Sequence, residues 1–157
     1  MAAQPPQSEK PRPCSAPAYR EFDFWAGDWD AFDYDNPAVA VARVRVNPIL
    51  DGCVLLEDYQ DTAGTHGESF SVYDETRGVW HQTWVTNRGR LLTIEGKLEG
   101  AEMVLSGADL TPQGKARSVR GVWKPVAGGV RETAVISMDN GKTWAPWFDL
   151  MFRAHKR

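Results

Sequence analysis

The sequence predicts an all-β fold, an up-and-down antiparallel β-barrel of about ten strands behind a disordered N-terminal tail. From Tyr19 onward, aromatic and β-branched residues come in short runs that end at Gly, Asn, Asp or Pro, a pattern typical of strands and turns. Closing such a meander into a barrel removes its two exposed edges. A β-sandwich is the alternative, but the uniformly short connections argue against it, because a Greek key needs a longer loop.

Each expected strand is about six to ten residues long, which leaves little room for helices. Gly and Asn in the turns supply the positive φ angles of tight hairpins, so strands that follow one another in the chain should be neighbours. Every second residue of a barrel strand faces the interior. The expected strands cover residues 24–33, 39–47, 53–60, 68–73, 79–86, 91–97, 102–107, 116–124, 130–138 and 147–153.

Length and composition indicate one domain. The 157 residues are enough for one hydrophobic core and too few for two. Half of the ten prolines lie within the first seventeen residues, among polar side chains. We therefore expect residues 1–19 to be a disordered tail and residues 20–157 to form the barrel.

The charge pattern excludes some partners. The net charge is −3 and the basic residues are scattered among acids, so nucleic acid is not an expected partner. No apolar run approaches the roughly 18 residues of a membrane-spanning helix. The N-terminal residues also lack the apolar stretch of a secretory signal, so we expect a cytoplasmic protein that does not bind membranes.

The two cysteines are not expected to form a disulfide. Cys14 lies in the Pro-rich tail and Cys53 lies in an apolar run, where it should be a small buried hydrophobic residue. Free thiols are consistent with a reducing compartment.

A Gly-x-Trp element, Gly27-Asp28-Trp29, begins the folded region, and Arg153 ends the last expected strand. This arrangement resembles the calycin superfamily of lipocalins, fatty-acid-binding proteins and nitrobindin-like barrels. The resemblance implies that the Gly-x-Trp element closes the barrel floor and that Arg153 packs over its indole, a cation–π contact.

Six further segments occur in a fixed order, at residues 24–29, 51–57, 73–74, 80–85, 103–107 and 137–144. In these segments the chain is similar to the bacterial DUF1579 family of calycin-like barrels, a resemblance that implies a fold and not an activity. Thr86 stands where that family often has Asp, and Ala134 stands where it often has Trp. If Ala134 faces inward, the missing indole enlarges the cavity and alters ligand choice.

Residues 137–144 also match the Asp-box turn of sialidase propellers. A propeller repeats its blade about every 40 to 50 residues, and this sequence has no such repeat. We expect a single rigid hairpin in which Asp139 and Thr143 satisfy turn amides and Trp144 packs.

The expected strand at residues 53–60 places a carboxylate among apolar side chains. Glu57 and Tyr59 share one face with Leu55. If that face lines the lumen, burial raises the pKa of Glu57 and makes it a candidate acid or base, with Tyr59 as a hydrogen-bond donor. Otherwise Glu57 pairs with an Arg across the sheet or faces solvent.

The expected strand at residues 79–86 offers a platform for a planar ligand. Trp80 and Trp84 flank Gln82 on one face, where the amide would fix ligand orientation. Packing alone could also explain the two indoles. His81 lies on the opposite face between valines, as a candidate for proton transfer or as a structural imidazole.

On the last expected strand, Trp147, Asp149 and Arg153 share one face, and we take Trp147 and Asp149 as candidate ligand-binding residues. Asp149 and Arg153 are too far apart on an extended strand to pair with each other, so each is expected to pair with a neighbouring strand. Further candidates for contact with a ligand carboxylate are Arg43, Arg45 and Arg120.

Metal and covalent chemistry have little support. The three histidines, His66, His81 and His155, show no paired spacing, and no Ser lies in a nucleophile elbow. The resemblance to nitrobindin-like barrels implies haem as an alternative, with His155 as its only candidate ligand. We expect no metal and no cofactor.

Two functions remain open. In the first, the protein binds a small apolar or aromatic molecule in the lumen, oriented by Gln82 and Glu57. The rings that would contact this molecule are Trp80, Trp84, Trp123 and Trp147. In the second, it is a cofactor-independent lyase, isomerase or cyclase in which Glu57 moves a proton with support from Tyr59 or His81.

The binding function is favoured, because an acid–base enzyme needs two groups in mutual reach and the sequence places only Glu57 and Tyr59 on one face. The fold itself hosts both kinds of protein. The sequence leaves open whether the protein forms a homodimer.

Overall fold

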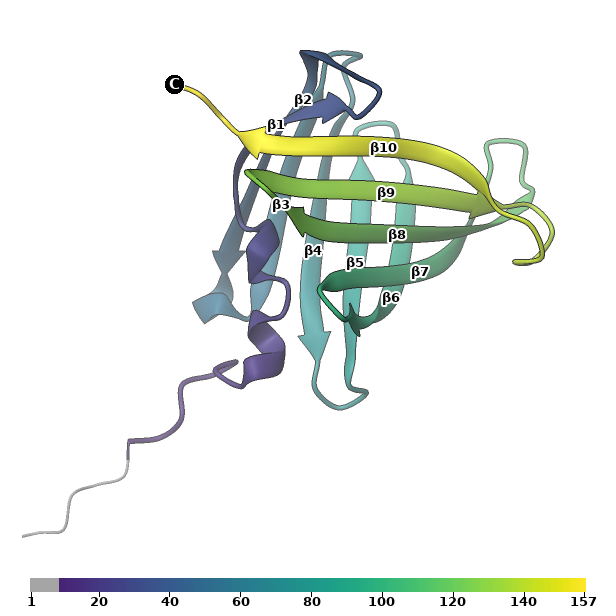
Figure 1. Cartoon of the computed structure of the whole chain (residues 1–157). Coiled ribbons are helices and arrows are strands. Elements are labelled where there is room, and N and C mark those ends of the chain that lie inside the picture. Colours follow the sequence, from purple (N-terminus) through teal and green to yellow (C-terminus); the bar gives the residue numbers. More distant parts are fainter. Residues whose placement is uncertain (1–8) are drawn as a thin grey trace, which may run out of the picture.

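The computed structural model describes residues 9–157. Its strands are β1 (Gly27–Asp33), β2 (Asn36–Ile49), β3 (Val54–Asp61), β4 (His66–Asp74), β5 (Val79–Thr86), β6 (Leu91–Glu99), β7 (Glu102–Leu110), β8 (Ala116–Val126), β9 (Gly129–Ser137) and β10 (Ala145–Ala154). Each strand pairs antiparallel with the next in the chain, and β1 also pairs with β10, so the sheet closes on itself (Figure 1). The predicted all-β barrel of ten strands is confirmed.

The strand bounds differ from expectation mainly at the N-terminal end. β1 begins at Gly27, later than predicted, because Asp23–Trp25 form a short 3-10 helix, η2. β2 begins at Asn36 and runs for 14 residues, because the turn from β1 lies at residues 34–35. Within residues 9–157, no helix is both long enough and apolar enough to cross a membrane.

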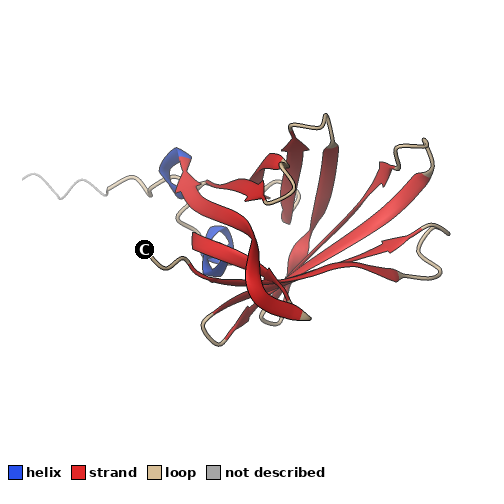
Figure 2. Cartoon of the chain, turned by 90° about the horizontal axis from the view of Figure 1, so that it is seen from above, coloured by secondary structure: helices blue, strands red, loops and turns tan. Residues whose placement is uncertain are grey.

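Aromatic side chains from the segment before β1 close one end of the barrel. Phe22 and Trp25 are fully buried and stack at 5.0 Å between ring centroids. The Phe22 ring also contacts Trp80 at 5.7 Å and Trp123 at 5.4 Å. The 3-10 helices of this segment are among those drawn in blue in Figure 2. We call the side chains of Phe22, Trp25, Trp80 and Trp123 the floor cluster. This cluster blocks access to the lumen from this end.

The Gly-x-Trp element supports the floor cluster from β1. The indole of Trp29 lies over Gly27, where an added Cβ would be only 2.6 Å from the ring. Its N–H donates to the Trp25 carbonyl at 3.0 Å. The expectation that Arg153 packs over this indole is wrong, because the Arg153 guanidinium donates to the Ala127 carbonyl and Phe152 packs against Trp29 instead.

A disulfide joins the N-terminal segment to the barrel. Cys14 is bonded to Cys53, which directly precedes β3, so the expectation of two free thiols is wrong. Nearby, Tyr19 from the 3-10 helix η1 (Pro17–Arg20) packs edge-on against Tyr73 at 5.3 Å. The structure thus differs from the expected disordered tail at residues 14–19, while residues 1–8 lie outside the described part of the chain.

We expect reduction of this disulfide to lower the free energy of unfolding by about 4 kcal/mol, because the link closes a loop with a sequence separation of 39 residues. Urea unfolding with and without a reductant measures the difference. The Cys14→Ser, Cys53→Ser double variant should match the reduced protein and show no response to reductant. Equal stability of the oxidised and reduced protein would contradict the link.

The expected Asp-box hairpin is confirmed. Asp139 accepts hydrogen bonds from the Thr143 amide at 2.8 Å and from the Thr143 hydroxyl at 2.6 Å. These donors, led by the hydroxyl, lower the pKa of Asp139 to about 2. The Trp144 ring packs under the Arg120 guanidinium at 4.5 Å, so Arg120 is held on the hairpin and not in the lumen.

Candidate functional site

A cavity of about 620 Å³ occupies the lumen above the floor cluster. It reaches the barrel mouth at the β3–β4 turn, where Thr62, Ala63 and Thr65 line it. Its walls come from alternating residues of the strands, as barrel geometry requires. The wall residues are Asp33, Val41, Glu57, Tyr59, Asp61, Gln82, Trp84, Thr86, Leu92, Ile94, Val119, Gly121, Trp123, Glu132, Ala134, Trp147, Phe148 and Leu150.

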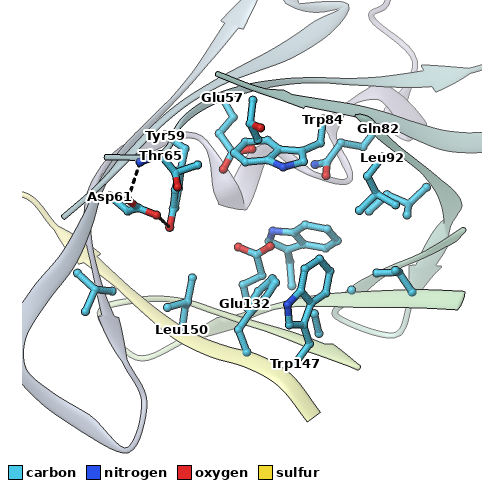
Figure 3. Close-up of a pocket in the computed structure, with 18 of the residues that line it drawn as sticks. Glu57, Tyr59, Asp61, Thr65, Gln82, Trp84, Leu92, Glu132, Trp147 and Leu150 are labelled. Carbon is cyan, nitrogen blue, oxygen red and sulfur yellow. Dashed lines mark hydrogen bonds between the residues drawn. The ribbon is translucent and has the colours of Figure 1, made fainter. Parts of the chain in front are cut away.

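Glu57 faces the lumen from β3, on the face that the sequence placed beside Leu55 and Tyr59 (Figure 3). Its side chain is buried, at 6% exposure, and the Ser69 hydroxyl donates to its Oε2 at 2.6 Å. Its Oε1 has no hydrogen-bond donor among residues 9–157. Burial raises the pKa of Glu57 to about 7, against the smaller opposing effect of the Ser69 hydrogen bond.

Glu132 faces the same lumen from β9, on the opposite wall (Figure 3). Burial raises its pKa well above the ordinary value, and the charge of Glu57 raises it further. The nearby indole N–H of Trp123 opposes this rise. That N–H is buried without a partner at hydrogen-bond distance, so it interacts with Glu132 only at longer range. The two carboxyl groups therefore hold their protons more tightly than free carboxyl groups do.

Tyr59 lies between the carboxylates and the mouth. Its ring meets Trp84 edge-on at 5.6 Å, and its hydroxyl donates to Asp61 over a long 3.4 Å. Burial, then the charges of Asp61 and Glu132, raise the pKa of Tyr59, so the phenol keeps its proton and acts as a donor. Asp61 also accepts from the amides of Ala63 and Thr65, both at 2.9 Å, which fixes the turn at the mouth.

Gly67 leaves space for the indole of Trp84 in the cavity wall. The Trp84 indole lies across Gly67 of the neighbouring strand, where an added Cβ would be 2.3 Å from the ring. Gln82, on the same face of β5, is buried and donates to the Ser71 hydroxyl at 3.0 Å. The structure thus places Trp84, Gln82 and also Trp123 in the lumen wall, as the sequence analysis expected.

Trp147 lines the mouth because of a shift in strand register, and not because of the inward–outward alternation of residues along β10. The ladder between β9 and β10 shifts register between Pro146 and Phe148, so Trp147 and Phe148 both line the cavity. The Trp147 ring is 43% exposed and lies 4.5 Å from the Arg117 guanidinium. Arg117 is held by Asp109 at 2.5 Å, in an ion pair whose side chains are 11% and 7% exposed.

Three predicted site residues lie elsewhere. His81 is on the outer face of β5, where its ring nitrogens contact Glu95 at 2.8 Å and Thr83 at 2.7 Å, so it cannot assist Glu57 in the lumen. Trp80 belongs to the floor cluster, and its indole donates to Glu21 at 3.2 Å. Asp149 faces outward from β10 and pairs with Arg131 at 2.6 Å, because it alternates with the inward Phe148 and Leu150.

The arginines that could have met a ligand carboxylate are also on the outside of the barrel. Arg43 pairs with Asp28 at 2.6 Å, and Arg45 pairs with Asp58 at 2.9 Å. Arg120 packs over Trp144 of the hairpin, so none of these three arginines lines the lumen.

The lumen lacks the axial histidine that the resemblance implies for a haem, because no histidine lines the cavity among residues 9–157. His155, the only candidate, lies outside β1 and β2, where it donates to Asp30 at 2.8 Å and accepts from Arg43 at 2.8 Å. No group of three metal-ligating side chains occurs in this part of the chain.

Glu132 was not among the expected site residues. The strand pattern could have identified it, because Glu132 shares a face with Val130 and Ala134 in the same way that Glu57 shares a face with Leu55. Ala134 does face inward and lines the cavity, at 4% exposure. An indole at this position would occupy part of the present lumen.

No family model matches the chain, and no curated protein matches it significantly. The resemblance to the DUF1579 family therefore stays a prediction.

Proposed function

We propose that the protein is a calycin-like barrel that binds a small apolar or aromatic molecule in its lumen. The observation that carries this proposal is the cavity itself, which at about 620 Å³ has the size of a small-molecule site. Its walls combine the rings of Trp84, Trp123 and Trp147 with a few polar groups, the composition typical of such sites.

Filling the lumen tests this proposal. We expect the neutral fluorophore N-phenylnaphthylamine to bind the wild-type protein, and Ala134→Trp to weaken that binding at least about tenfold, because the indole takes the ligand's space. The matched control is Thr133→Trp, which adds the same ring to the other face of β9. Equal affinity of the two variants, by fluorescence titration, would contradict binding in the lumen.

The facing carboxyl groups favour a second candidate, a cofactor-independent lyase, isomerase or cyclase. Glu57 and Glu132 line one lumen, and the charge of Glu57 adds to the rise that burial causes in the pKa of Glu132, so Glu132 supplies the second group that acid–base catalysis needs. Tyr59 is a donor in the same wall. Incubation with a metabolite extract, followed by mass spectrometry, separates the two functions: a compound that is converted by the wild type and not by Glu57→Gln supports the enzyme, whereas one retained unchanged supports the binder.

The Cys14–Cys53 disulfide weighs against the cytoplasmic location expected from the sequence. Disulfides persist in oxidising compartments and are rare in the cytosol.

A further inference from the structure

The charged groups around the lumen all have one sign. Among the described residues, four carboxylates line the cavity, namely Asp33, Glu57, Asp61 and Glu132, and no Lys, Arg or His does. The outer wall is different, because it carries arginines that pair with several of its carboxylates: Asp28 with Arg43, Asp58 with Arg45, and Asp149 with Arg131. The lumen therefore lacks the counter-charge that the rest of the barrel supplies.

Two of these carboxyl groups, those of Glu57 and Glu132, lie on opposite walls of the lumen. Neither Glu57 nor Glu132 has a cationic group within 4.0 Å among residues 9–157. Glu57 lines the cavity and is 94% buried, yet its Oε1 has no hydrogen-bond donor among residues 9–157. A buried carboxylate without a partner is costly, and a cation from the ligand would remove that cost for both groups at once.

The aromatic walls favour the same ligand charge. The rings of Tyr59, Trp84 and Trp123 line the cavity next to the carboxylates. The faces of such rings carry negative electrostatic potential and attract ammonium groups, most strongly where water is excluded. An anionic ligand would meet four carboxyl groups and no cationic side chain among the residues that line the cavity.

We propose that the lumen selects a hydrophobic amine, an aromatic or apolar molecule with one protonated nitrogen that lies between Glu57 and Glu132. This inference rests on the proposed binding function and specifies the chemistry of its ligand. The apolar part of the amine contacts Trp84, Trp123 and Leu150, and the ammonium donates to the free Oε1 of Glu57 and to Glu132.

Three probes that share one ring system and differ in charge test the inference. Naphthylethylamine, naphthylethanol and naphthylacetic acid carry a cation, a neutral hydroxyl and an anion at about pH 8. By isothermal titration calorimetry we expect the amine to bind at least about tenfold more tightly than the alcohol, and the acid to bind most weakly. Glu57→Gln and Glu132→Gln should each reduce the ratio of amine affinity to alcohol affinity, because each removes a carboxylate and keeps a hydrogen-bonding group.

The control variant is Glu68→Gln, which removes one carboxylate from the outer wall of β4 and should leave the amine preference intact. If the alcohol binds as tightly as the amine, the inference is overturned while binding in the lumen stands. An amine preference that survives the double variant of Glu57 and Glu132 also overturns it. Absence of binding by all three probes overturns the proposed function together with the inference.

Discussion

Replacing Glu57 by Gln should stabilise the protein in alkaline solution and leave its stability unchanged in acid. Burial raises the folded-state pKa of Glu57 to about 7, from 4.5 for an ordinary Glu. Between these two pH values the folded wild type binds a proton that the unfolded chain releases, so wild-type stability falls as the pH rises. Glutamine does not titrate, and its amide oxygen can still accept the Ser69 hydroxyl.

The free energy of unfolding of Glu57→Gln should therefore exceed that of the wild type by about 3 kcal/mol above pH 7, and by close to zero below about pH 4. Urea unfolding across this pH range measures the difference. Glu68→Gln serves again as the control, because it makes the same substitution at an exposed position on the outer wall. A constant difference between Glu57→Gln and wild type at every pH would show that Glu57 is not buried in a carboxylate-rich lumen.

Removing Asp109 should destabilise the protein by about 3–5 kcal/mol, because Asp109→Ala leaves the Arg117 guanidinium buried without its partner. Asp109 accepts from Arg117 through both carboxylate oxygens, at 2.7 and 2.5 Å, and from Arg90 at 3.2 Å. The variant should also loosen Trp147, whose ring packs on Arg117.

Two further variants separate burial from charge. Asp149→Ala breaks an equally short ion pair, with Arg131, whose side chains are about one-third exposed, and it should cost much less. Replacing Asp109 and Arg117 together by Leu and Met should restore most of the lost stability, because an apolar pair needs no counter-charge. Equal losses for Asp109→Ala and Asp149→Ala, by urea unfolding near neutral pH, would contradict the burial argument.

The sequence predicted what depends on alternation and on turn chemistry. The ten strands follow from the turn residues, and the shared faces of Glu57 with Tyr59 and of Gln82 with Trp84 follow from the two-residue period of a strand. The structure, and not the sequence, shows that these faces line the lumen. The same period identifies His81 and Asp149 as outward, once their neighbours are known to face the lumen.

What the sequence could not predict depends on contacts between distant strands. Trp147 reaches the mouth through a register shift between Pro146 and Phe148, which the alternation of residues along the strand does not predict. Cys14 and Cys53 are brought together by the path of the chain before β1, which composition alone suggested was a solvated tail. Glu132 gains its role only because β9 faces β3 across the lumen.

The floor cluster has a kinetic consequence for any molecule held in the lumen. Phe22 and Trp25 are fully buried and seal one end, so entry and exit share the mouth beside Thr65 and Trp147. A competing molecule cannot enter from the floor end while the bound molecule still occupies the lumen. Exchange must then be dissociative, and the rate at which a bound molecule leaves should not change with the concentration of its competitor.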